Sequence, residues 1–283
     1  SLDTMTPLEI VTVMNQEDNK VIAAVNSQLE KIAEVVTWAT ESLYNDGRII
    51  YMGAGTSGRL GVLDAVECPP TFGVSFENVV GLMAGGEQAF VKAQEGAEDS
   101  ETFGHDDLVN INLTSSDIVI GLAASGRTPY VIGGLKYAKE VGCKTATISC
   151  NENSKIGTYA DISIEAVVGP EVLTGSTRLK SGTAQKMILN MISTGSMVGF
   201  GKAYSNLMVD VKQSNEKLVV RAQNIVIEAT GVTREVAEAT LSKSNDSVKV
   251  AIVMIMFEVD YEQALSLLKD AKGHIGRIKG ENK

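Results

Sequence analysis

Two short segments rich in glycine and hydroxyl side chains are the part of this sequence best suited to chemistry. They are Gly53-Ala54-Gly55-Thr56-Ser57-Gly58 and Ala123-Ala124-Ser125-Gly126-Arg127-Thr128-Pro129. Each follows an apolar run and opens a stretch with helical spacing, so its N–H groups and hydroxyls would meet at a helix N-terminus, where anions bind. The first segment alone fits a helix cap equally well, but two such segments favour a phosphate site. Its candidate ligands are Thr56, Ser57, Ser125, Gly126 and Thr128.

The glycine spacing of the first segment also fits a dinucleotide-binding loop, but the residues after it do not. Such a loop is followed about 20 residues later by an acid that binds a ribose. The nearest acid, Glu77, lies beyond Pro69-Pro70 in loop-like sequence.

The 35 acidic and 25 basic residues give a formal charge of -10, which argues against binding to nucleic acid or to an anionic membrane. We therefore expect a small anionic ligand held in a pocket.

Cysteine content and the N-terminus indicate the compartment. The three cysteines are irregularly spaced and cannot all pair within the chain, which suits a reducing environment. The first residues lack a basic region followed by an apolar stretch, and no charge-free run approaches the roughly 18 residues of a membrane span. We therefore expect a cytoplasmic protein. His105 and His274 stand alone in polar segments, so we interpret them as surface residues and not as metal ligands.

Apolar strands alternate with helices through most of the chain. Strands are expected at 48–52, 79–83, 117–122, 145–149 and 162–164, and helices at 8–43 (one or two), from the first glycine segment to Ala65 or Val66, at 87–95, 128–140 and 182–198. This order predicts a doubly wound α/β fold with a mainly parallel sheet, in which ligands bind at the carboxyl ends of the strands. We expect this domain to span residues 1–222, and a small helical subdomain to follow over 223–283.

Several motifs carry a resemblance to a known family. The residues at 53–59 and 124–128 resemble the phosphosugar loops of the sugar-isomerase (SIS) fold. The run 58–71, which contains Glu67-Cys68-Pro69-Pro70, resembles the N-acetylmuramic acid 6-phosphate etherases, as do Glu95-Gly-Ala-Glu-Asp99 and Asn206-Leu-Met-Val-Asp210. This resemblance covers nearly the whole chain. The glucokinase regulatory protein, which is related to this family, binds phosphosugars without converting them.

The resemblance implies a lyase that needs neither a metal nor a cofactor. Such an enzyme cleaves the lactyl ether of N-acetylmuramic acid 6-phosphate and yields N-acetylglucosamine 6-phosphate and D-lactate. The resemblance further implies a homodimer, a place in N-acetylmuramate catabolism and peptidoglycan recycling, and Glu67 and Glu98 as the catalytic residues. Two alternatives remain open, which are a non-catalytic phosphosugar-binding regulator and an aldose-ketose isomerase.

The reaction itself defines what the two carboxyl groups must do. In the ring-opened sugar the aldehyde acidifies the proton on carbon two, so a base can remove it and expel lactate from carbon three before water adds. Carboxyl groups can take and supply these protons. Our hypothesis is that Glu98 handles the carbon-two proton, while Glu67 protonates the leaving lactate and then activates water.

Without the resemblance, these residues would be interpreted as ordinary ones. Glu67 is expected in the last turn of a helix, where a carboxylate opposes the helix dipole, and Glu98 belongs to an acidic segment that suits a solvated turn. Three basic residues either lend charge to a phosphate or pair with nearby acids. They are Arg59, Arg127 and Lys180.

Overall fold

The computed structural model describes residues 1–92, 94, 96–211 and 216–279. The chain divides into two compact units, the first formed by Ser1–Val66 and Phe76–Gly195 and the second by Glu67–Ser75 and Ser196–Lys283. The domain boundary predicted between residues 222 and 223 stays a prediction, and one helix, α8 (Glu216–Thr230), runs across these two positions.

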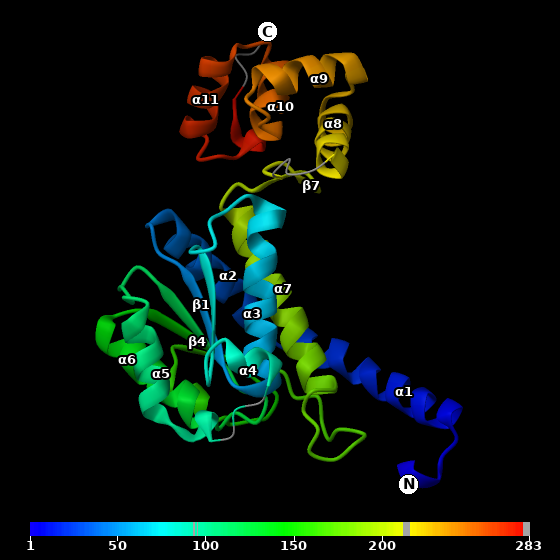
Figure 1. Ribbon diagram of the computed structural model, residues 1–283, viewed down its shortest axis with the longest axis vertical. Coiled ribbons are helices and arrows are strands. Elements are labelled where there is room, and N and C mark those ends of the chain that lie inside the picture. Colours follow the sequence, from blue (N-terminus) through cyan, green and yellow to red (C-terminus); the bar gives the residue numbers. More distant parts are fainter. Residues whose placement is uncertain (93, 95, 212–215, 280–283) are drawn as a thin grey trace. The chain divides into compact units, whose positions relative to one another are not determined.

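A five-stranded parallel sheet forms the centre of the first unit (Figure 1). The strand order is β2-β1-β3-β4-β5 and every neighbouring pair is parallel. The strands are β1 (Ile49–Gly53), β2 (Val79–Met83), β3 (Ile118–Leu122), β4 (Lys144–Ser149) and β5 (Ile162–Glu165). All five lie within one or two residues of their predicted positions, and the predicted α/β class is confirmed.

Helices cover both faces of this sheet. Neighbouring residues of β1 point to opposite faces: Tyr51 lies against Gly61 of α3, and Met52 lies against Gly134 of α6. α3 and α6 therefore pack on opposite faces, as Figure 1 also shows. The helices that lie wholly or mainly in this unit are α1 (Pro7–Asn26), α2 (Leu29–Tyr44), α3 (Gly55–Phe72), α4 (Gln88–Val91), α5 (Glu101–Asn110), α6 (Pro129–Val141) and α7 (Lys180–Gly199), with the 3-10 turns η1 (Leu2–Thr4), η2 (Ala97–Asp99) and η3 (Ile156–Tyr159).

The predicted end of the helix after the first glycine segment is wrong. α3 does not stop at Ala65 or Val66 but continues through Pro69 and Pro70 to Phe72. Both prolines lie in its last six residues; their fixed φ is compatible with a helix, and each loses one backbone hydrogen bond to the preceding turn. Glu67 consequently lies one turn before the last turn of the helix, so the argument from the helix dipole no longer applies to it.

The helix predicted over 87–95 is much shorter than expected. α4 is a single turn, and its C-cap residue Lys92 has extended backbone angles, φ -124° and ψ 120°. Glu95, which belongs to a motif that carries the family resemblance, lies outside the described residues. The acidic spacing here therefore marks a turn region in which only a short helix forms.

In the part of the second unit that the structure describes, four whole helices surround a common apolar core. α10 (Val248–Phe257) is apolar along nearly its whole length and contacts the three others. These are α8, α9 (Arg234–Lys243) and α11 (Tyr261–Asp270), and the unit also holds the hairpin of β6 (Ala203–Tyr204) and β7 (Leu207–Met208) and the turn η4 (Ile275–Arg277). Asp210, which follows the hairpin, pairs with Lys249 of α10. None of the helices, as far as the structure describes them, has the length and apolar character needed to cross a membrane.

Candidate functional site

The two hydroxyl-rich segments leave neighbouring strands at the same edge of the sheet. β1 pairs with β3, and Gly53 lies opposite Leu122 at the carboxyl ends of the two strands. The chain passes from β1 to β2 on one side, and from β3 to β4 on the other. A parallel sheet with this order has its topological switch point between β1 and β3, where such folds bind ligands.

The glycines of the first loop have two different roles. A Cβ on Gly53 would lie 2.9 Å from the Gly58 nitrogen, and one on Gly58 would lie 2.6 Å from the Gly53 oxygen, so both positions need glycine for a tight turn. Gly55 has φ +53°, and a Cβ there would meet nothing within 4 Å. Because α3 begins at Gly55, the first N–H groups of α3 have no helical acceptor. The loop therefore presents free N–H groups beside an open space.

The four predicted hydroxyl ligands differ in whether another protein group already uses the hydroxyl. Thr56, Ser125 and Thr128 are half-buried, and their side chains make no hydrogen bond to the described part of the chain. Ser57 is buried, and its hydroxyl donates to Oε1 of Gln185 at 2.8 Å. Half-buried hydroxyls that bond to no protein group can exchange hydrogen bonds with water for hydrogen bonds with a ligand, so these three are available to a ligand.

The second loop is held firmly by main-chain contacts. Gly126 has φ +71°, and a Cβ there would lie 2.6 Å from the Cβ of Ser154. Its carbonyl accepts from the Ile156 N–H at 2.9 Å. The carbonyl of Ala124, two residues earlier, accepts from the side-chain amide of Asn151 at 3.0 Å. Gly126 is therefore required for the shape of this turn, whatever the turn binds.

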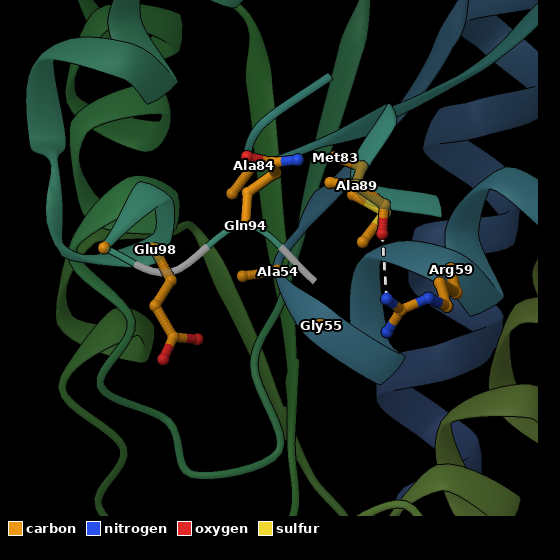
Figure 2. A pocket seen from close by; sticks show the side chains of 9 residues that line it. Ala54, Gly55, Arg59, Met83, Ala84, Ala89, Gln94 and Glu98 are labelled. Atoms are coloured by element: carbon orange, nitrogen blue, oxygen red, sulfur yellow. Dashed lines mark hydrogen bonds between the residues drawn. The ribbon is translucent and has the colours of Figure 1, made fainter. Parts of the chain in front are cut away.

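A cavity of about 300 Å³ lies beside the first loop (Figure 2). Its size is at the lower end of the range for small-molecule sites. Figure 2 shows Glu98 and Arg59 on opposite sides of Ala54 and Gly55 in this view. The cavity is lined by Ala54, Gly55, Arg59, Met83, Ala84, Ala89, Gln94, Gly96 and Glu98. The structure thus brings one of the two predicted carboxylates to the wall of a pocket that the first loop also lines.

The two predicted catalytic carboxylates have different surroundings. Glu98 lies in η2, directly after Gly96 and Ala97, and its side chain is exposed at the cavity. Glu67 is exposed on α3 and belongs to the second compact unit. The neighbouring Cys68 is buried, at 2% exposure, as expected for a free cysteine that packs as a small apolar residue.

The candidate cations are mostly engaged with other protein groups. Arg59 donates from Nε to the carbonyl of Phe90 and from Nη2 to that of Ala89, both at 2.8 Å. Lys180 is fully buried and forms an ion pair of 2.7 Å with Glu17, and the hydrogen bonds from Lys180 and from Lys20 lower the pKa of Glu17 to about 2. Lys180 therefore pairs with an acid, which is one of the two roles expected for it.

The two histidines differ from each other in exposure. His105 is exposed as predicted and pairs with Asp106 at 2.9 Å. His274 is half-buried, contrary to the prediction, and its Nε2 lies 3.0 Å from the Gly199 carbonyl. Burial lowers its pKa. Within the described residues, no group of three His, Cys, Asp or Glu side chains is placed to hold a metal ion; the metal-free reaction stays an expectation.

Known proteins resemble this chain over almost its full length. An N-acetylmuramic acid 6-phosphate etherase from Francisella tularensis subsp. tularensis is 61% identical over 97% of this chain and 94% of its own length. The enzyme of that name from Bacillus cereus is 57% identical over the same shares of the two chains. The chain belongs to the N-acetylmuramic acid 6-phosphate etherase family. This finding confirms the family predicted from the motifs.

The domain families and solved structures agree with the etherase family at the level of the fold. Residues 30–139 match the glucokinase regulatory protein N-terminal SIS domain, and residues 91–195 match the SIS domain. A phosphoheptose isomerase from Francisella tularensis is 16% identical, and the match has a TM-score of 0.50 over 68% of this chain and 98% of that one. A phosphoheptose isomerase from Neisseria gonorrhoeae gives the same values. These two likenesses show the SIS-type fold alone.

Sequence reasoning about this etherase-family chain missed the polar side chains buried between α3 and α7. Gln185 is 1% exposed and Asp64 is 6% exposed. Asp64 accepts from Asn190 at 2.7 Å and from Ser193 at 3.1 Å, and burial raises its pKa. The available signal was spacing, because Ser57 and Asp64 are seven residues apart and so share one face of a helix.

Proposed function

We propose that this protein is a carbon–oxygen lyase that cleaves the D-lactyl ether of N-acetylmuramic acid 6-phosphate. Its products would be N-acetylglucosamine 6-phosphate and D-lactate. The observation that carries the proposal is the 61% identity, over 97% of the chain, to a protein named as this etherase. The glycine loop beside a cavity that Glu98 lines is consistent with a phosphorylated sugar as substrate.

In the proposed site, two loops bind the phosphate group. The first N–H groups of α3 and the hydroxyl of Thr56 come from the loop after β1, and Ser125, Gly126 and Thr128 come from the loop after β3. Ser57 contributes its main-chain N–H, because its hydroxyl already donates to Gln185. N–H groups and hydroxyls can hold a phosphate in a chain of charge -10 without a general basic surface.

The proposed reaction is an elimination followed by addition of water. Glu98 takes the proton from carbon two of the ring-opened sugar, and the electron pair forms a double bond to carbon three as the C–O bond to lactate breaks. Glu67 gives its proton to the departing lactate oxygen. It then takes a proton from water, which adds at carbon three, while carbon two regains a proton. Each carboxyl group is thereby restored.

The finer parts of the proposal concern assembly, compartment and pathway. We propose a cytoplasmic homodimer that acts in N-acetylmuramate catabolism and peptidoglycan recycling, with a catalytic domain over 1–222 and a helical subdomain over 223–283. The dimer is supported by α1, whose only buried side chains are Val21, Ala24 and Val25. Leu8 and Val11 of the same helix are 74% and 57% exposed, and a second copy would cover such residues. Sedimentation equilibrium tests the dimer.

Lactate release tests the activity directly. The purified protein is incubated with N-acetylmuramic acid 6-phosphate, and D-lactate is measured with a dehydrogenase-coupled assay. Stoichiometric lactate and N-acetylglucosamine 6-phosphate are expected. A well-folded protein that binds the sugar phosphate without releasing lactate would be a regulator, and one that forms a ketose phosphate would be an isomerase. Either result would reject the etherase.

The division of roles between the two carboxylates needs a separate experiment. In deuterium oxide, the protein should introduce deuterium at carbon two, and Glu98→Ala should abolish this exchange. Glu67→Ala should retain part of the exchange while losing lactate release. Normal exchange in the Glu98 variant would refute the assignment.

A further inference from the structure

We infer that Gln185 is a positioning residue that ties the two phosphate-binding loops together through the hydroxyl of Ser57. The inference rests on the proposed function in one respect, namely that these loops hold the substrate's phosphate. Gln185 is 1% exposed and Ser57 is 7% exposed, so their 2.8 Å hydrogen bond lies out of contact with water. Polar groups buried in this way keep a single geometry only when they are paired.

The direction of this hydrogen bond is determined by a third group. Nε2 of Gln185 donates to the main-chain carbonyl of Ile148 at 3.4 Å. Because a carbonyl only accepts, the amide nitrogen must face Ile148 and the amide oxygen must face Ser57. The Ser57 hydroxyl therefore has to donate its proton to Gln185, and that proton is not available to a bound phosphate. The side chain of Ser57 anchors the loop, and its main-chain N–H remains free for the ligand.

The same carbonyl supports the second loop. Ile148 lies in β4 opposite Leu122, the last residue of β3, and its oxygen also accepts from the Ala123 N–H at 3.1 Å. Ala123 is the first residue of the loop that contains Ser125. A single amide on α7 thus connects the start of α3 with the start of the second loop. Its loss would release both loops relative to each other.

A second polar contact between the same two helices provides a matched control. Asn190 of α7 donates to Asp64 of α3 at 2.7 Å. Asp64 lies seven residues after Ser57 in α3. This contact joins α3 to α7 but involves neither loop. A change that only loosens the two helices should therefore have the same effect at either position, whereas a change in loop geometry should arise at Gln185 alone.

The experiment compares Gln185→Met with Asn190→Ala. Methionine matches glutamine in length and removes the hydrogen bonds with little change in packing. Calorimetric titration with inorganic phosphate gives the phosphate Kd, lactate release gives kcat and KM, and thermal unfolding gives Tm. We expect Gln185→Met to raise the phosphate Kd and the substrate KM about tenfold with kcat within about twofold. We expect Asn190→Ala to lower Tm and leave Kd and KM within about twofold.

Ser57→Ala guards against a Gln185 variant that does not fold. It removes the other partner of the same hydrogen bond and leaves the main chain intact, so it should weaken phosphate binding to a similar degree. The double variant should bind phosphate no more weakly than either single variant, because both changes break one interaction.

Three results would overturn the inference. They are an unchanged phosphate Kd in both Ser57→Ala and Gln185→Met, an equal rise in Asn190→Ala, and additive losses in the double variant. The phosphate titration does not depend on lactate release, so this inference and the proposed etherase activity can fail separately. A wild-type protein that binds phosphate with a Kd that depends on Gln185, but releases no lactate, would reject the etherase and leave this inference intact.

Discussion

The amino and carboxyl ends of β1 and β3, which form the amino and carboxyl edges of this part of the sheet, differ in whether their polar side chains are hydrogen-bonded. At the amino ends, Asp117 is 2% exposed and accepts hydrogen bonds from the main chain and guanidinium of Arg48 and from the Thr114 N–H, at 2.7 to 3.1 Å. At the carboxyl ends, Thr56 and Ser125 make no side-chain hydrogen bond within the described part of the chain.

This difference separates stability from function within one pair of strands. Buried polar groups that are all paired hold a structure together, and breaking one leaves an uncompensated partner. Half-buried hydroxyls that bond to no protein group can be satisfied by water, so removing one costs the fold little, while a ligand can replace that water. Changes at Asp117 should therefore affect folding without catalysis, and changes to the unpaired hydroxyls at the carboxyl edge should do the reverse.

The largest effect is expected at Glu98, on the cavity at the carboxyl edge. Glu98→Gln keeps the size of the side chain and removes its ability to take a proton. We expect kcat for lactate release to fall by about 10² to 10⁴, with Tm unchanged because the side chain is exposed. If Tm fell enough for unfolding to explain the lost activity, the separation of stability from function would be contradicted.

The next largest effect is expected at Asp117, at the amino edge. Asp117→Ala leaves the main-chain N–H and Nε of Arg48 and the Thr114 N–H without their acceptor, and we expect about 3 kcal/mol of lost stability in urea unfolding. The exposed pair of Lys136 and Glu101 is the control, since both side chains are more than 40% exposed. Lys136→Ala should cost less than about 1 kcal/mol. At urea concentrations too low to unfold the variant, kcat and KM of Asp117→Ala should equal those of the wild type.

A smaller effect is expected at Thr56. Thr56→Val preserves the branched shape and removes the hydroxyl, so KM for the phosphorylated sugar should rise about tenfold. Stability should stay constant or increase, because no hydrogen bond to the described protein is lost. If Thr56→Val destabilised the fold without affecting KM, the hydroxyl would be a helix cap and not a ligand.

The smallest effect concerns pH and sharpens the contrast at Asp117. Burial acts to raise the pKa of Asp117, but hydrogen bonds from Arg48 and Thr114 outweigh it, and the pKa is lowered from its usual 3.8. Its stabilising contribution is therefore complete above the unfolded value and is lost as pH falls through the folded pKa. The stability difference between wild type and Asp117→Asn should shrink between about pH 5 and 2. A constant difference across that range would show that the carboxylate contributes no charge-dependent stability.

Local pattern was sufficient to predict the sheet and most helices. The strand at 79–83 matches β2, because a continuous apolar run between turn residues has few other solutions. The end of α3 was missed because a proline lacks an N–H and crowds the preceding turn, and so usually ends a helix, whereas α3 continues through Pro69 and Pro70. α4 was overestimated because acidic residues suit both helices and turns.

The candidate site was predictable in its loops and not in its supports. Glycine and hydroxyl side chains at strand ends are visible in the sequence. The pairing of Ser57 with Gln185 joins residues 128 positions apart, and nothing in the local spacing indicates it. The assignment of Glu67 and Glu98 rested on family resemblance, and their roles stay a prediction.

The neighbouring position of β1 and β3 also has a consequence for when the site forms during folding. The two strands begin at residues 49 and 118, so 69 positions of chain must be ordered or looped before they can pair. Contacts between such distant segments form slowly, since the loop entropy is lost before the contacts stabilise the fold. In a refolding experiment, the recovery of phosphate binding should therefore lag behind the recovery of helix content. A newly made chain would acquire its ligand site late, after its first helices have already formed.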